Sequence, residues 1–379
     1  MADKPRKIRK GRAGRSASRF DTVLRLLNPH RFGESLELGA QPSLRNATLA
    51  GLQAAIAVAV CVPLLELSPW SHLVGFAALG SLVALFGRFA PQYHRSGIVL
   101  KCVFWQTVAV FSMSATAWLG WSQTAQLALL AFACGFYLLV CFNAKFGAPG
   151  PLIFIFAVGA SITDTLSLEQ VMERTLATAA AALFAWLICV ASEKLRDFPT
   201  AERPFPTVPD QSVSYLLFMS ARVALAAFIV VFLSHACGLQ YPAWAAMGAV
   251  AVMQGSHLHI NMHRALQRTL GTIVGAMLAW LLLAQQPSIW PLIIVLVLLQ
   301  FLIEVVIGIN YALGQVLVTP MALLMTHLAA PASAGASMVP ERVIDTLLGA
   351  IVGMVISIVL SNIEDRQMLE RYHRSRMRR

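Results

Sequence analysis

Long runs of apolar residues, separated by short polar turns, dominate the hydropathy pattern of the chain. Many runs reach about 18 or more residues, the length that an α-helix needs to cross a bilayer core roughly 30 Å thick. The first half predicts spans at 44–65, 70–87, 97–119, 124–142, 149–162 and 171–192. After a polar, proline-rich stretch, further spans are predicted at 214–237, 241–256, 264–284, 289–307, 310–329 and 341–361. Twelve spans would place both termini on one side of the membrane.

The composition is that of a helical membrane protein. Hydrophobic residues make up 58% of the 379 residues and charged residues only 12%, whereas a water-soluble domain carries roughly 25% charged residues. The six cysteines fall in apolar segments without metal-site spacing, so we expect no metal site and no cofactor. The P-loop, DDxxD and HxxxxD motifs are missing from the sequence, which argues against ATP-driven pumping and common lipid-modifying enzymes.

Basic residues are concentrated at the two ends of the chain. Ten of the 29 lie in the first 31 positions and six lie in the last 14. Beside so many apolar spans, these clusters predict cytoplasmic ends near anionic lipid rather than nucleic-acid binding. That orientation places seven further basic residues at cytoplasmic loops, namely Arg88, Arg95, Lys145, Lys194, Arg196, Arg203 and Arg264. Only Arg174 and Arg342 then lie at outer loops.

The two halves of the chain resemble each other in sequence. Shifts of 167, 168 and 177 residues bring matching residues together, pairing Lys101 with Arg268, Asn143 with Asn310, Arg174 with Arg342 and Arg45 with Arg222. We therefore expect two parallel six-helix transmembrane repeats, at 44–192 and 214–361. A basic cytoplasmic segment (1–43), a cytoplasmic linker (193–213) and a basic cytoplasmic tail (362–379) complete the predicted organisation.

A second similarity lies between spans that this topology makes antiparallel. RTLATAAAALFAWL from Arg174 matches RTLGTIVGAMLAWL from Arg268 at eight of fourteen positions. Three-helix units of inverted topology, nested inside each half, would explain the match. The general likeness of apolar helices rich in alanine and leucine is the alternative.

Three segments of the second half occur together and in order: RTLGTIVGAMLAW, NYALGQVLVTPMALL and ERVIDTLLGAIVG. In this set the chain resembles the fusaric acid resistance (FUSC) and aromatic acid exporter family, which is distantly related to plant aluminium-activated malate transporters. The resemblance covers most of 35–361 and is clearest over 215–361. It implies a multi-pass protein of the bacterial inner membrane that exports small, often aromatic, organic acids.

Cations placed inside the apolar spans are candidates for substrate binding, because a charge in the bilayer interior costs several kcal/mol. Four are found, namely Arg222, Arg268, Lys101 and Arg45. Since the repeats superpose them in pairs, they could converge on one cavity and bind a carboxylate, the arginines through a bidentate fork. The alternative for each is that its side chain reaches out to lipid phosphates.

Polar residues in the tenth and eleventh spans suggest further roles. Glu304 is either a proton-coupling carboxylate or half of a structural ion pair with Arg222 or Arg268. Beside Pro320, which would open a kink and expose polar backbone, a second substrate-contact cluster is predicted at Asn310, Tyr311, Gln315 and Thr319. A plain helix kink is the alternative. Arg174 and Arg342 either anchor helix starts at the outer interface or form an exit gate.

The leading functional hypothesis is a proton-coupled secondary transporter that exports small organic anions and is not an enzyme. A passive organic-anion channel and a membrane subunit of an envelope complex are the alternatives. The expected partners are the organic anion and the lipid bilayer, with a periplasmic adaptor protein and a second copy of the chain as further candidates. The substrate, the coupling ion and the oligomeric state are not specified by the sequence.

Overall fold

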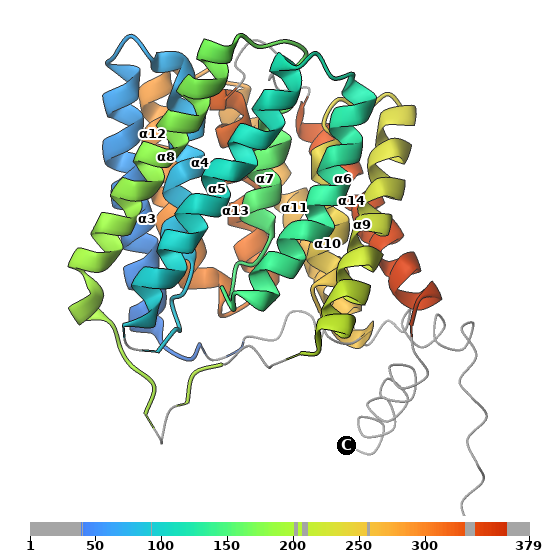
Figure 1. Ribbon diagram of the computed structural model, residues 1–379. Coiled ribbons are helices and arrows are strands. Elements are labelled where there is room, and N and C mark those ends of the chain that lie inside the picture. The colour runs from blue at the N-terminus through green and yellow to red at the C-terminus, as the bar shows by residue number, and fades with distance from the viewer. Residues whose placement is uncertain are drawn as a thin grey trace, which may run out of the picture.

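The computed structural model describes residues 39, 41–91, 93–200, 204–206, 211–255, 258–329 and 338–361. These residues form a bundle of α-helices, and no strand occurs among them (Figure 1). Most of the predicted basic termini, 1–43 and 362–379, and part of the predicted linker lie outside the described residues.

Each predicted span contains one helix of the structure. The first half comprises α3 (Leu44–Glu66), α4 (Val74–Ser81), α5 (His94–Trp118), α6 (Gln123–Asn143), α7 (Leu152–Ala160) and α8 (Leu168–Ala191). The second half comprises α9 (Val213–Ala236), α10 (Pro242–Met253), α11 (Leu258–Leu283), α12 (Ile289–Ile307), α13 (Tyr311–Ala329) and α14 (Met338–Val359). Short 3₁₀ turns, η1 (Ser71–Leu73) and η2 (Leu82–Leu85), flank α4, and η3 (Glu193–Leu195) follows α8.

Three of the twelve helices are too short to be full spans. Nine helices among the described residues are long and apolar enough to cross a membrane. In contrast, α4, α7 and α10 have eight, nine and twelve residues, and even twelve residues rise only about 18 Å of the roughly 30 Å required. Twelve complete spans are therefore not confirmed.

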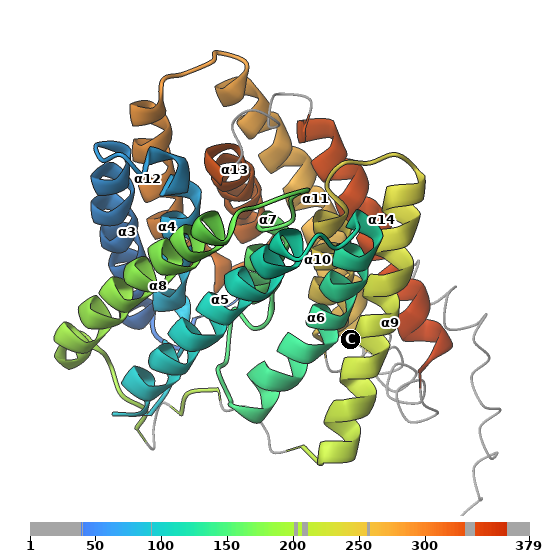
Figure 2. The ribbon, with the colours of Figure 1, turned by 45° about the horizontal axis from the view of Figure 1, so that its top comes forward.

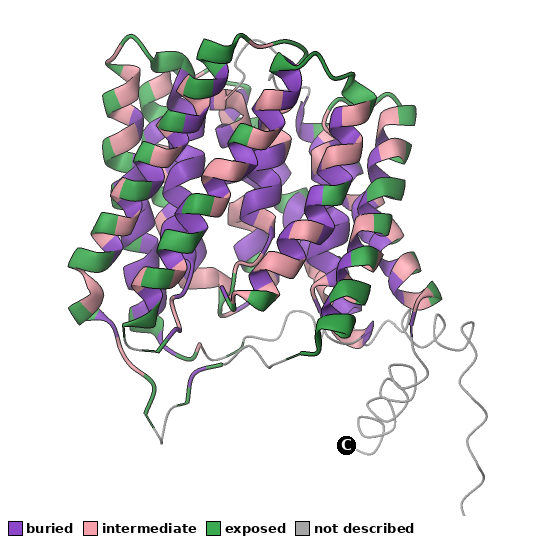
Figure 3. Ribbon diagram, in the orientation of Figure 1, coloured by how far each residue is buried: buried purple, intermediate pink, exposed green. Residues whose placement is uncertain are grey.

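The short helices α4 and α10 lie in the interior of the bundle, enclosed by the long ones. All residues of α4 and all but one of α10 are buried. The long helices instead expose large apolar side chains on their outer faces, including Leu64, Phe104 and Leu176. Figure 3 shows this change from buried to exposed around the helices. Such an apolar exterior suits contact with lipid, since a soluble monomer rarely exposes large apolar patches.

Helix packing repeats between the halves. In the first half α4 and α5 pack on α8, and in the second half α10 and α11 pack on α14. Across the two halves α3 packs on α12 and α6 on α9, while α4 packs on α13 and α10 on α7. In Figure 2 the ends of α3 and α12 lie beside one another, as do those of α6 and α9.

Glycines allow close approaches of helices at equivalent places in the two halves. A Cβ atom added at Gly80 of α4 would lie 2.4 Å from the Thr178 carbonyl oxygen of α8. The same atom at Gly248 of α10 would lie 3.1 Å from the Thr346 carbonyl oxygen of α14. Both residues of the second pair stand 168 positions after those of the first. In lipid, such close backbone contact is a principal source of helix association.

Candidate anion-binding site

A cavity of about 440 Å³, here called the inner cavity, lies between the two halves of the bundle. Its walls come from η2, the α6–α7 turn, α7, α10, α11, α12 and α13. It lies toward the end of the bundle where α3 begins, because Gln41, just before α3, donates to the Val305 carbonyl of α12 at 2.5 Å. In the orientation predicted from charge, this is the cytoplasmic end.

The ionisable groups that line the inner cavity are mostly cationic: Arg88, Arg264, Arg268 and Glu304. Arg268 is only 2% exposed, and its Nη1 atom donates to the Tyr311 hydroxyl at 3.3 Å. Among the described residues, its Nε and Nη2 atoms have no hydrogen-bond partner. A buried guanidinium with two free donors can bind a carboxylate in a bidentate manner.

Amide side chains add further donors to the cavity wall. Gln254, Gln300 and Gln315 all line it, and within the described part of the chain their Nε2 atoms lack a hydrogen-bond partner. Buried polar groups are normally satisfied, so a cluster of unsatisfied ones points to a ligand. The apolar wall contains Phe142 and Phe156, which offer ring faces to an aromatic ligand.

An ion pair between Arg88 and Glu304 joins the two halves at the cavity wall. Arg88 Nη1 donates to Glu304 Oε2, and the two side chains are 11% and 5% exposed. The sequence predicts Arg222 or Arg268 as the partner in an ion pair of Glu304. That choice of partner is wrong, because the structure pairs Glu304 with Arg88. Arg88 had been assigned to a loop because it follows an apolar run; the chain instead turns after η2 and directs the Arg88 side chain into the protein.

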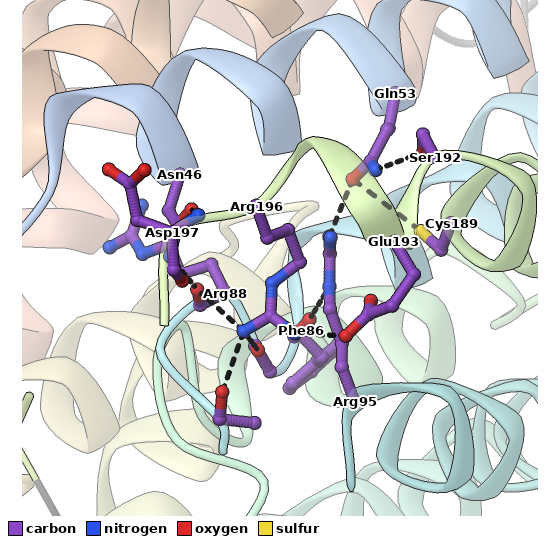
Figure 4. A network of polar contacts seen from close by, with 12 residues as sticks. Asn46, Gln53, Phe86, Arg88, Arg95, Cys189, Ser192, Glu193, Arg196 and Asp197 are labelled. Carbon is purple, nitrogen blue, oxygen red and sulfur yellow. Dashed lines mark hydrogen bonds and ion pairs between the residues drawn. The ribbon is translucent and has the colours of Figure 1, made fainter. Parts of the chain in front are cut away.

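A polar network fixes the backbone that carries Arg88 (Figure 4). The Arg88 carbonyl accepts from Asn46 Nδ2 at 3.1 Å and from Arg196 Nη2 at 3.2 Å. Arg196 also donates to the Ala90 carbonyl at 2.7 Å and pairs with Glu193 at 2.5 Å. The segment between η2 and α5 is therefore attached to both ends of the first half, and Arg88 is held in position opposite Glu304.

Arg95 also holds the segment between η2 and α5 in place. Its guanidinium is 1% exposed and donates to the Ala84 carbonyl at 2.8 Å, the Phe86 carbonyl at 3.3 Å and Gln53 Oε1 at 2.6 Å. The Gln53 amide in turn donates to the Ser192 hydroxyl at 2.6 Å. The sequence predicts Arg95 at a cytoplasmic loop and carries no signal of this structural role.

The predicted substrate contacts are only partly brought together. Those that line the inner cavity are Arg268, Tyr311 and Gln315, together with the predicted coupling residue Glu304. The cations Lys101 and Arg45 are exposed, and Arg45 donates to the Leu195 carbonyl at 2.7 Å. Arg222 is half-buried on α9, and its Nη2 atom lies 3.5 Å from the Ser357 carbonyl of α14. Of the four cations predicted to converge, Arg268 alone lines this cavity.

The other two predicted contacts make hydrogen bonds within α13. Asn310 Oδ1 accepts from the backbone N–H groups of Ala312 and Leu313 and so caps the helix start. Thr319 is fully buried, and its hydroxyl donates to the Gln315 carbonyl at 2.9 Å. Neither side chain lines the inner cavity.

A second cavity of about 560 Å³, here called the outer cavity, lies toward the opposite end of the bundle. Asp164, His235, Tyr241 and Trp244 are among its lining residues. Burial and the nearby Glu341 carboxylate raise the pKa of Tyr241, which lies just before α10. Phe156 of α7 lines both cavities and is 6% exposed.

Part of the second half resembles a known protein family. Residues 225–356 match the family model described as fusaric acid resistance protein-like. The matched region includes Arg268, Glu304 and Tyr311, so it contributes much of the wall of the inner cavity. No curated protein and no solved structure matches the chain.

The fusaric acid resistance-like match and the long apolar helices agree with each other. The family comprises membrane transporters, and nine helices of the described chain can cross a membrane. The resemblance seen in the sequence is thereby confirmed over 225–356. The described helices are those of a multi-pass membrane protein, and residues 225–356 resemble a transporter family.

Proposed function

We propose that this protein exports small organic carboxylates, mainly aromatic ones, from the cytoplasm and binds them in the inner cavity. The observation that carries the proposal is the buried Arg268 guanidinium, which presents free Nε and Nη2 donors among the described residues of a cationic cavity. With three arginines and one glutamate, the lining has a net charge of +2 (3 − 1). A carboxylate would supply the missing acceptors and part of the missing negative charge.

The size and apolar lining of the cavity favour an aromatic acid. Its volume of about 440 Å³ lies within the roughly 300–1,000 Å³ typical of small-molecule sites. Phe142, Phe156 and Tyr311 can pack on a ring while Arg268 holds the carboxylate. The name of the family points in the same direction, because fusaric acid is an aromatic carboxylate.

Alternating access between two parallel six-helix repeats would move the substrate. The matched packing of α4 and α10, and of α3–α12 and α6–α9, supports this duplication. Because the Arg88–Glu304 pair crosses from one half to the other at the cavity, its opening and closing would accompany relative motion of the halves. The nested inverted three-helix units stay a prediction.

Glu304 would couple the substrate to protons through Arg88. An ionised Glu304 competes with the substrate carboxylate for Arg88, whereas protonation of Glu304 frees Arg88 and raises the charge of the lining from +2 to +3 (3 − 0). A proton and an anion would therefore bind together. A monocarboxylate would then leave together with one proton and without net movement of charge, so its own outward concentration gradient would drive the export. A Glu304→Gln variant is expected to bind the anion at least as tightly and to lose the pH dependence.

The bacterial inner membrane, with both termini cytoplasmic, is the proposed location. This orientation opens the inner cavity toward the cytoplasm and the outer cavity toward the periplasm. A passive anion channel is the second candidate function, because Phe156 lines both cavities and so brings them near each other. A membrane subunit of an envelope complex, a periplasmic adaptor and a homodimer remain further hypotheses.

Flux measurements in proteoliposomes test the proposal. Fusarate, benzoate and succinate are supplied with and without imposed pH and voltage gradients, to wild type, Arg268→Gln and the matched control Lys101→Gln. We expect fusarate and benzoate flux that falls at least tenfold in Arg268→Gln and is unchanged in Lys101→Gln. Equal loss in both variants would contradict the assigned site. Flux without saturation or pH dependence would indicate the channel, and no flux in wild type would refute carboxylate export by the isolated chain.

A further inference from the structure

Arg342 of α14 is a buried cation that does not line the inner cavity. Its side chain is 0% exposed, and within the described part of the chain its Nε, Nη1 and Nη2 atoms all lack a hydrogen-bond partner. A guanidinium carries five N–H donors, so this is an extreme case of unsatisfied buried polarity. The sequence predicts Arg342 at the outer membrane interface, either as an anchor or as an exit gate.

A neighbouring carboxylate does not satisfy Arg342. Asp345 lies one turn further along α14 and interacts electrostatically with the guanidinium. Its Oδ1 atom is taken by the Ser234 hydroxyl of α9 at 2.7 Å. Its Oδ2 atom has no hydrogen-bond partner among the described residues. The pair thus lies close without direct contact, and the donors of Arg342 remain available to another acceptor.

Arg342 connects the surroundings of the two cavities. Its guanidinium lies over the ring of Trp244, 5.2 Å from the centroid, and Trp244 lines the outer cavity. Arg342 is also close enough to Arg268 for their charges to interact, and Arg268 lines the inner cavity. Helices α11 and α14, which carry the two arginines, pack against each other.

Two buried hydroxyl groups lie on the same two helices. Thr272 stands one turn after Arg268 on α11, and Thr346 one turn after Arg342 on α14. Both side chains are fully buried, and their Oγ1 atoms have no hydrogen-bond partner in the described chain. Two like-charged guanidinium groups and two free hydroxyls offer donors to an anion that approaches between the cavities.

The equivalent residues of the first half provide an internal comparison. Arg174 stands 168 positions before Arg342 and stacks on Phe76, the counterpart of Trp244, at 5.0 Å. However, Arg174 is half-buried rather than fully buried, and Ala177 replaces Asp345. The stacking is therefore shared by both halves, whereas the complete burial and the nearby carboxylate occur in the second half.

We propose that Arg342 is a second anion-binding residue, which takes the substrate carboxylate between the inner and outer cavities. The inference rests on the proposed function and extends it to a second binding position. The carboxylate would pass from Arg268 to Arg342, past Thr272 and Thr346, while the aromatic ring moves past Phe156. Asp345 offsets part of the charge of Arg342, so that the anion is bound there and still released.

Tryptophan fluorescence with benzoate tests the second position directly, since Trp244 lies against Arg342. Wild type, Arg342→Gln, Arg342→Lys, Trp244→Phe and the matched control Arg174→Gln are compared as monodisperse full-length protein in detergent. Benzoate is expected to change the fluorescence of wild type and Arg174→Gln. The change should be lost in Arg342→Gln and Trp244→Phe and be reduced in Arg342→Lys, which keeps the charge but lacks the fork.

Binding and flux separate this inference from the proposed function. Benzoate should still raise the Tm of Arg342→Gln through the inner cavity, while flux falls at least tenfold; in Arg268→Gln the Tm shift should be lost. Wild-type fluorescence change and flux in Arg342→Gln would overturn the inference and leave the inner site intact. No response of wild type to benzoate in any measurement would overturn the proposed function and the inference together.

Discussion

Contact between α11 and α13 positions Arg268. The variant Gly271→Ala, which adds one methyl group at this contact, tests that role. Gly271 stands three residues after Arg268, on the face of α11 that meets α13. An added Cβ would lie 2.5 Å from the Ala312 carbonyl oxygen and 2.5 Å from Gln315 Cβ. Since ordinary contacts of this kind begin near 3.4 Å, the helices must separate by about 1 Å.

The expected cost follows from this overlap. Overpacking of a close-packed interface costs about 1–3 kcal/mol, so Gly271→Ala should lower the free energy of unfolding by about that amount. The separation would also stretch the 3.3 Å contact between Arg268 and the Tyr311 hydroxyl beyond hydrogen-bonding range. Loss of that bond, worth about 1 kcal/mol, should weaken carboxylate binding by about fivefold.

Gly97→Ala is the matched control, because a Cβ at Gly97 in α5 meets no atom within 4 Å. The control should keep wild-type stability or gain up to about 1 kcal/mol from helix propensity. Unfolding followed by circular dichroism in mixed micelles gives the stability, and fusarate titration gives the affinity. Equal stability and affinity in the two variants would show that α11 and α13 do not approach as closely as described.

The Arg88–Glu304 pair and the Asn310 cap give two further predictions. Removing one member of a buried ion pair costs about 3–5 kcal/mol. Arg88→Gln should therefore lower the free energy of unfolding by about that amount. The double variant, Arg88→Gln with Glu304→Gln, should recover most of the lost free energy. Additive single-variant effects in that double-mutant cycle, measured by unfolding, would show that the pair does not couple the halves. Asn310→Ala should cost about 1 kcal/mol as a lost helix cap with unchanged KM for fusarate; a raised KM with unchanged stability would instead support the direct substrate contact predicted from sequence.

The sequence alone determined which segments become helices. Apolar runs and their polar breaks located all twelve, because burial in lipid and backbone hydrogen bonding depend on local composition. Ordered motifs in the second half also predicted the resemblance to the fusaric acid resistance family, which the match over 225–356 confirms. Among charged residues, Arg268 and Glu304 could be chosen in advance because a charge inside an apolar span requires a reason.

Only the tertiary structure decided how far each helix extends and which charges meet. Whether an apolar run crosses the bilayer or ends inside the bundle depends on the neighbours that enclose it, as for α4, α7 and α10. Arg88 and Glu304 stand 216 positions apart, and Arg342 is distinguished from Arg174 by burial that no local pattern reveals. Charge interactions depend on distance and local dielectric, and both are set when the two halves pack together.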